Sequence, residues 1–303
     1  MGKFINPFTD VGFKRIFGQE VTKDLLISFL NTLLEGERHI TDVQFLDKEQ
    51  LPENSHDRGL IYDIYCMTES GERIVVEMQN RSQANFKDRA LLYLSKAIVG
   101  QSKKGEEGNT YAVNAVYGVF FMNFSEKQFG SEFRTDVGLM DMKTRTLFSD
   151  RMRMIFLQLP EFNKEPEECE TFFDRWIYVL KNMEIFDRMP WAAQYAAFKR
   201  LSEICEVAAL TPRERERYEE SIKVYRDNLA IAERAVEEGF AKGHAEGLAK
   251  GHAEGLAKGH AEGLAEGEHR KQIDIALQMK KAGLPLEQIT QFTGLSVDEI
   301  NHL

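Results

Sequence analysis

The stretch LIYDIYCMTESGERIVVEMQ, residues 60–79, decides the fold of this chain. Its two ends, 60–67 and 73–79, are rich in Ile, Val and Tyr, which favour β-strands. Between them, residues 69–72 read Glu-Ser-Gly-Glu, and the glycine suits a tight turn that needs a positive φ. We therefore expect two antiparallel strands joined by a hairpin.

The hairpin places three polar side chains near one another. Glu77 and Gln79 stand two residues apart on the second strand and therefore project from the same face. A two-residue turn would place Asp63 opposite Met78, whereas a one-residue bulge would place it opposite Glu77. In both registers the two carboxylates are cross-strand or diagonal neighbours. Opposed carboxylates about 5 Å apart repel each other, and a hard divalent cation such as Mg²⁺ relieves that repulsion.

A charged residue in a strand most often faces solvent, and that is the simplest interpretation of these carboxylates. Two neighbouring features weigh against it. Glu77 directly follows the apolar run 74–76, and a buried carboxylate needs a partner. The segment 79–104 then carries six Lys or Arg residues against one Asp, a net charge of +5 in a chain of −10. A phosphodiester backbone requires such a basic strip. The candidate DNA-binding residues are Arg81, Lys87, Arg89, Lys96, Lys103 and Lys104.

Outward from the hairpin, the first half of the chain alternates helix and strand patterns. Apolar residues recur at helical spacing over 13–33, and 86–101 is a second predicted helix. A near-continuous apolar run at 115–124 is typical of a buried strand. Shorter strands are expected at 43–46, 136–142 and 152–159. This order predicts an α/β domain with a mixed sheet over residues 1–160.

The second half is helical and acidic. Residues 161–303 hold a net charge of −8, which leaves −2 for residues 1–160, so the overall acidity does not exclude a nucleic-acid partner. We divide this half into a helical region at 161–238, a small-x-Gly-x repeat at 239–268, and a terminal helical hairpin at 269–303. The hairpin faintly resembles a helix-turn-helix, but its acidic side chains favour packing over DNA recognition.

The repeat AKGHAEGL starts at residue 241 and recurs at 249 and 257. Glycine costs a helix about 1 kcal/mol relative to alanine, so a lone helix here is marginal. Glycines four apart also form a smooth stripe that a partner helix can approach closely. We expect the chain to form a homo-oligomer through the repeat helix and the terminal hairpin. Histidines eight apart turn by roughly 80° each, so His244, His252 and His260 do not converge on a metal.

The cysteines and the lengths of the apolar runs indicate in which cellular compartment the protein functions. Cys66, Cys169 and Cys205 are far apart, and no CxxC spacing occurs. This pattern favours a reducing setting without structural disulfides. No run approaches the roughly 18 apolar residues of a membrane helix, and the N-terminus lacks the features of a secretion signal. We expect a cytoplasmic protein with no membrane partner.

Four short motifs together resemble one known family. They are Asn-Pro-Phe-Thr-Asp at 6–10, Val-Glu-Met-Gln at 76–79, Arg89-x3-Tyr93, and Tyr-Gly-Val-Phe-Phe at 117–121. Their combination resembles the Rpn family of recombination-promoting nucleases, also described as transposases, within the PD-(D/E)XK superfamily. The resemblance is strongest over residues 4–124. It implies a restriction-endonuclease-like mixed sheet core flanked by helices, followed by an all-α C-terminal region.

The resemblance also implies an activity and a site. The activity is that of a DNA endonuclease dependent on Mg²⁺ or Mn²⁺, which promotes recombination and hydrolyses phosphodiester bonds with a metal-activated water. By position, Asp63 and Glu77 would be catalytic metal ligands, helped by the backbone carbonyl of Met78. Gln79 stands where the superfamily usually has Lys. Asp10 would reach the metal directly or through water, or would instead cap the first helix.

A second function stays open. Gln79 can orient a water or a phosphate only by hydrogen bonds, and the tail is acidic and helical. These features motivate the alternative that the chain is a catalytically weak or inactive protein of the nuclease fold that binds DNA or assembles.

Overall fold

The computed structural model describes residues 2–50, 60–83, 85–101 and 112–303. The chain forms two compact units, Met1–Ala232 and Glu233–Leu303. In chain order, the principal elements of the first unit are α1 (Asp10–Phe17), α2 (Lys23–Leu33), β1 (Val43–Phe45), β2 (Glu49–Gln50), β3 (Leu60–Ile61), β4 (Ile64–Thr68), β5 (Arg73–Gln79), α3 (Phe86–Val99), β6 (Val116–Met122), β7 (Arg134–Met140), β8 (Leu147–Gln158), α4 (Phe172–Asn182) and α5 (Ala196–Cys205). The chain continues with α6 (Pro212–Lys281), α7 (Leu286–Thr293) and α8 (Val297–Asn301).

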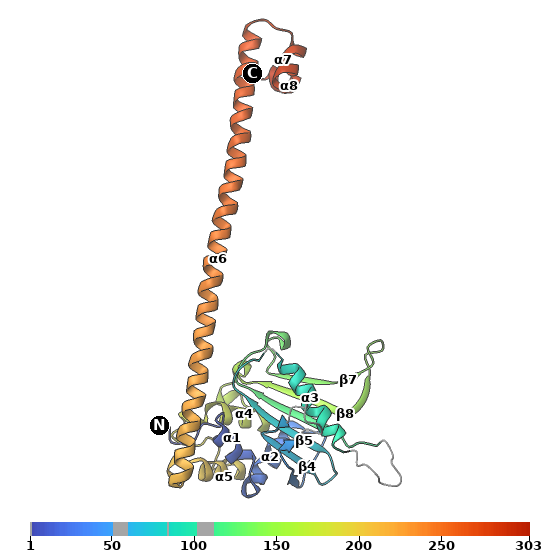
Figure 1. Ribbon diagram of the computed structural model, residues 1–303, viewed down its shortest axis with the longest axis vertical. Helices are drawn as coiled ribbons and strands as arrows, with labels where there is room; N and C mark the ends of the chain where they lie inside the picture. The colour runs from blue at the N-terminus through green and yellow to red at the C-terminus, as the bar shows by residue number, and fades with distance from the viewer. Residues whose placement is uncertain (1, 51–59, 84, 102–111) are drawn as a thin grey trace. The chain divides into compact units, whose positions relative to one another are not determined.

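A six-stranded mixed sheet forms the centre of the first unit (Figure 1), in the order β1-β4-β5-β6-β8-β7. The central strands β5, β6 and β8 run parallel, and β1, β4 and β7 pair antiparallel with their neighbours. Short strands β2 and β3 form a separate antiparallel pair. The predicted mixed α/β sheet flanked by helices is therefore confirmed.

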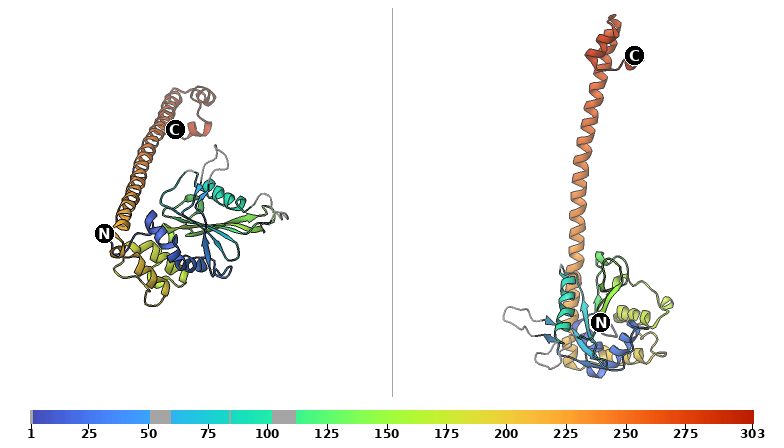
Figure 2. Two further views of the ribbon diagram at one scale, coloured as in Figure 1. Left: turned by 60° about the horizontal axis from the view of Figure 1, so that its bottom comes forward. Right: turned by 90° about the vertical axis from the view of Figure 1, so that its right-hand side faces the viewer.

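Side chains alternate between two cores on the two faces of the sheet, as the two-residue period of a strand requires. Along β6, Val119 and Phe121 enter the larger core, whereas Phe120 and Met122 enter the smaller one. Helix α3 covers the smaller core, and α1, α2, α4 and α5 cover the other face (Figure 1 and Figure 2). The unit therefore has three layers, and both faces of its parallel strands are buried.

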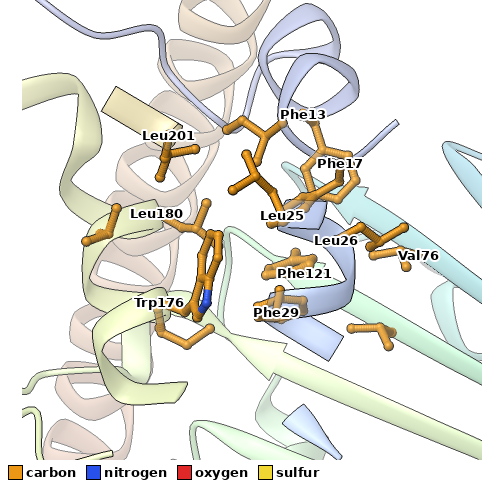
Figure 3. Close-up of a cluster of buried hydrophobic side chains, with 14 of the residues drawn as sticks. Phe13, Phe17, Leu25, Leu26, Phe29, Val76, Phe121, Trp176, Leu180 and Leu201 are labelled. Atoms are coloured by element: carbon orange, nitrogen blue, oxygen red, sulfur yellow. The ribbon is translucent and has the colours of Figure 1, made fainter. Parts of the chain in front are cut away.

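Aromatic rings hold the first helices against the larger core (Figure 3). The ring of Phe121 lies 5.5 Å from that of Phe13 and 5.2 Å from that of Phe29. Trp176 of α4 lies 6.0 Å from both Phe17 and Phe29. Such pairs add about 0.5–1.5 kcal/mol each beyond the area they bury. They fix α1, whose exposed side begins with Asp10.

Helix α3 packs on the face of the sheet that carries the smaller core, and it comes close to β6 at Gly118. A Cβ atom at Gly118 would lie 2.5 Å from Cδ1 of Leu94 and 2.7 Å from the ring of Phe120, so any larger residue would force these side chains to shift. Phe86, at the start of α3, makes edge contacts with Phe120 and Phe156. These contacts set the height of α3 above β5 and β6.

The predicted strand 60–67 is in fact two strands. Tyr62 donates its backbone N–H to the carbonyl of Lys48 at 3.0 Å, so the chain up to Tyr62 belongs to the β2–β3 pair. From Ile64 onward it joins the main sheet between β1 and β5. Asp63 lies at the step between the two ladders.

In the second unit, the remainder of α6 is followed by a small helical hairpin. Ala276, Ile289, Leu295 and Ile300 form its core. Gly294, with φ of +74°, ends α7 in the left-handed conformation that glycine tolerates. The α6 helix continues through the glycine repeat. Across the described residues, no helix combines the length and apolar character needed to span a bilayer.

Candidate active site

The β4–β5 hairpin sets the positions of the two carboxylates. Ile64 pairs with Val76, a register that places Asp63 opposite Glu77. Gly71 closes the turn with φ of +82°, as expected for a bulged loop whose last residue is left-handed. Of the two predicted registers, the structure therefore has the bulged one.

Reciprocal hydrogen bonds tie the carboxylates to the opposite strands. The backbone N–H of Asp63 donates to Oε1 of Glu77 at 3.0 Å, and that of Met78 donates to Oδ2 of Asp63 at 2.9 Å. Nε2 of Gln79 donates to Oε2 of Glu77 at 3.3 Å. The structure thus brings the three residues predicted to be catalytic into one bonded group. Glu77 is only 1% exposed, whereas Asp63 is half-buried.

Burial raises the pKa of both carboxyl groups. Burial, and then the charge of Asp63, raise the pKa of Glu77 to about 8. Burial also raises the pKa of Asp63, although the Met78 N–H bond and the charge of Lys14 oppose that rise. Burial therefore opposes the ionisation of two adjacent carboxyl groups, and a bound cation would favour the ionised form of both.

Arg89 is the basic residue of α3 that faces this pair. Its Nη2 lies 3.8 Å from Oε2 of Glu77, and its Nε donates to the hydroxyl of Tyr93 at 2.9 Å. The Tyr93 hydroxyl in turn donates to the carbonyl of Ile61 at 3.3 Å. The charge of Arg89 lowers the pKa of Glu77 but does not offset the effect of burial.

The other predicted DNA-binding residues are more dispersed. Lys87 lies over the ring of Phe129, 4.9 Å from its centroid. Lys96 shares the face of Arg89 but lies about 10 Å further along α3, from the 1.5 Å rise per residue. Arg81 is exposed just beyond β5. Lys103 and Lys104 lie outside the described residues.

Asp10 is not the cap of α1, so the capping alternative is wrong. Thr9 is the N-cap, and its hydroxyl accepts from the N–H of Gly12 at 3.0 Å. Asp10 is instead the first helical residue and forms an ion pair with Lys14 at 2.6 Å. Its charge raises the pKa of Asp63, which places Asp10 in the electrostatic surroundings of the site.

Two lysines that the sequence patterns did not select belong to the same cluster. Burial, and then the charge of Lys14, hold the pKa of Lys48 below its usual range, while Asp63 and Asp10 oppose this. Lys14 lies within the predicted first helix, but no sequence pattern relates it to Asp63. Lys48 reaches the site through the β2–β3 pairing, which the sequence did not predict.

The donors present fit a hard divalent cation. Among the residues that the structure describes, no three or more His, Cys, Asp or Glu side chains gather as a metal cage. Mg²⁺ does not require one, because it usually keeps several waters and uses one or two carboxylates. Asp63 and Glu77 supply those carboxylates, and Met78 lies between Glu77 and Gln79 on the same strand.

Comparison with known proteins gives one match. The model of a family described as PD-(D/E)XK nuclease family transposase matches residues 7–235. This span covers well over half of the chain and includes the whole sheet, helices α1 to α5 and the bonded group of Asp63, Glu77 and Gln79. No curated protein and no solved structure matches the chain.

Proposed function

The chain belongs to the PD-(D/E)XK nuclease transposase family, and from that premise we propose that it is a DNA endonuclease dependent on Mg²⁺ or Mn²⁺. The observation that carries the proposal is the buried pair of Asp63 and Glu77. Each accepts a backbone N–H from the other's strand, so both are fixed before any ligand arrives. Preorganised donors of this kind are what metal-assisted hydrolysis requires.

Each residue then has a role in hydrolysis. Asp63 and Glu77 would hold the metal, and the backbone carbonyl of Met78 would supply a third oxygen. When bound, the metal lowers the pKa of a water and shields charge on the phosphate. Gln79 orients that water or the phosphate through its amide, and Arg89 holds Glu77 in place and offers its remaining donors to the DNA backbone.

Plasmid cleavage tests the proposal. We expect Asp63→Asn and Glu77→Gln each to reduce Mg²⁺-dependent cleavage at least about 100-fold, because changes even to groups that only support a ligand cost 10- to 100-fold. Asp88→Asn, an exposed acidic residue in the first turn of α3, is the control. Cleavage that survives both substitutions, or that persists in EDTA, would remove the assignment.

We also propose that this cleavage promotes recombination, as the resemblance to recombination-promoting nucleases implies. A recombination assay in cells that express wild-type protein or Asp63→Asn tests it. Equal recombination frequencies for the two proteins, at equal protein levels, would show that recombination does not depend on the nuclease site.

Self-association of the second unit is a further part of the proposal. Eight glycines at four-residue spacing cost a lone helix about 1 kcal/mol each, and in the described structure nothing packs within 4 Å of where their Cβ atoms would lie. Leu248, Leu256 and Leu264 are exposed on the same stretch. A second copy of the chain that covered this surface would offset the cost of the glycines.

Light scattering on the full chain tests the self-association. Changing these three leucines to lysine should lower the assembly mass, whereas changing His244, His252 and His260 to alanine should leave it unchanged. An unaltered mass for the leucine variant would contradict the proposal. If the wild-type chain assembles and binds DNA but binds no metal and does not cleave, the result would support the alternative of a non-catalytic protein with the nuclease fold.

A further inference from the structure

Hydrolysis of a phosphodiester places additional negative charge on the scissile phosphate, and an active site gains most from a cation aimed at that charge. On β5, position 79 offers only an uncharged amide. Arg89 lies 3.8 Å from Glu77 and donates its Nε to the hydroxyl of Tyr93, and we have assigned its remaining donors to the DNA backbone. Among the residues that the structure describes, Lys14 and Lys48 are further cations whose charges interact with Asp63.

The backbone places Lys48 beside the site. Glu49 pairs with Ile61, so the residue before Glu49 stands across from Tyr62. The N–H of Tyr62 donates to the carbonyl of Lys48 at 3.0 Å. Tyr62 is itself anchored, because its hydroxyl donates to the carbonyl of Tyr93 at 3.0 Å and its side chain is buried. Lys48 is therefore held across from the residue that precedes Asp63.

The charges around Lys48 distinguish it from Lys14. Asp10, Lys14, Lys48 and Asp63 act on one another electrostatically and form one cluster. Lys14 is already paired with Asp10 at 2.6 Å. Lys48 is half-buried, and within the described parts of the chain no carboxylate lies at ion-pair distance from its ammonium group. Of the two lysines, Lys48 is therefore the one whose ammonium group is better placed to bind a phosphate.

We propose that Lys48 is a catalytic residue that contacts the scissile phosphate and stabilises the negative charge developing on it. The inference rests on the proposed nuclease function and adds a residue to it from outside the β4–β5 hairpin. The lysine comes from the segment between β1 and β2, so the cation and the carboxylates approach the phosphate from different elements.

Single-turnover cleavage and DNA binding together test this role. We expect Lys48→Gln to reduce the cleavage rate at least about 100-fold, in the range measured for loss of one group that stabilises developing charge. Lys48→Arg, which keeps the charge, should retain more activity than Lys48→Gln. The control is Lys23→Gln, because Lys23 lies on α2 and pairs with Asp42. Thermal melting and Mn²⁺ titration establish that the variants fold and bind metal.

A second readout does not depend on cleavage. For a duplex bound in EDTA, the dependence of log K on log salt should weaken by about one unit of slope in Lys48→Gln, because one phosphate contact is lost. If the wild-type protein cleaves and Lys48→Gln cleaves equally well, the inference is overturned while the nuclease function stands. If the wild-type protein does not cleave, the nuclease function fails, and an unchanged salt slope then overturns the phosphate contact as well.

Discussion

Replacing Glu77 with glutamine should change how the stability of the metal-free protein depends on pH. An ordinary glutamate loses its proton near pH 4.5, whereas folded Glu77 keeps its proton up to about pH 8. Between these values the folded state binds more protons than the unfolded state, so the free energy of unfolding falls as pH rises. Above pH 8 both states are ionised and the fall ends.

The size of the effect follows from the pKa. Each pH unit between the two pKa values changes stability by about 1.4 kcal/mol. The slope levels off as the pH nears the folded pKa, so from pH 6 to pH 8 the wild-type protein should lose about 2 kcal/mol through Glu77. Glu77→Gln has no proton to release at this position, so this contribution disappears. Contributions from unaltered parts of the chain cancel when the two proteins are compared.

Urea unfolding in EDTA at pH 6, 7, 8 and 9 measures this difference. Glu69→Gln is the matched control on the same hairpin, because bonds from the backbone N–H of Thr41 lower the pKa of Glu69 to about 2. Glu69 is therefore ionised in both states throughout this range, and its substitution should shift stability by a constant amount. Parallel pH dependences for wild type and Glu77→Gln would refute the assignment of Glu77 as a buried carboxyl that retains its proton.

Two other substitutions probe the supports of the site. Gly118→Ala should destabilise the protein by about 1–3 kcal/mol, because its new methyl group would lie 2.5 Å from Leu94 of α3; urea unfolding measures this. Gly138→Ala, where the nearest atom would be 3.7 Å away, is the control, and an equal effect of both would contradict the close approach of α3. Arg89→Ala should raise the pKa of Glu77 further, since Arg89 lowers it, and should move the pH midpoint of Mn²⁺ binding upward. An unchanged midpoint would show that Arg89 does not act on Glu77.

Local patterns predicted the hairpin and most of the sheet. Strand periodicity and the glycine at 71 depend on neighbours in sequence, so both could be recognised without the fold. The register could not be chosen, because the turn sequence permits both loop lengths. Asp63 and Glu77 were recognised as neighbours because either register brings them close.

Features that depend on pairing between residues far apart in the chain could not be predicted from the sequence. The break at Tyr62 depends on the carbonyl of Lys48, which lies outside the predicted hairpin, and the same pairing hides Lys48 from any local pattern. The charge of segment 79–104 was counted along the chain, yet only Arg89 of α3 meets the carboxylates while Lys96 lies two helical turns away. Thr9 and Asp10 are both good capping residue types, so only the structure could distinguish their roles.

Calorimetric titration with Mn²⁺ at pH 8.5 tests the central claim most directly, which is that Asp63 and Glu77 form a metal centre. At that pH Glu77 is mostly ionised, so binding has little competition from protons. We predict a saturable binding isotherm for the wild-type protein and for Asp88→Asn, and loss of that isotherm in Asp63→Asn and Glu77→Gln. Equal Mn²⁺ binding by all four proteins would contradict the claim.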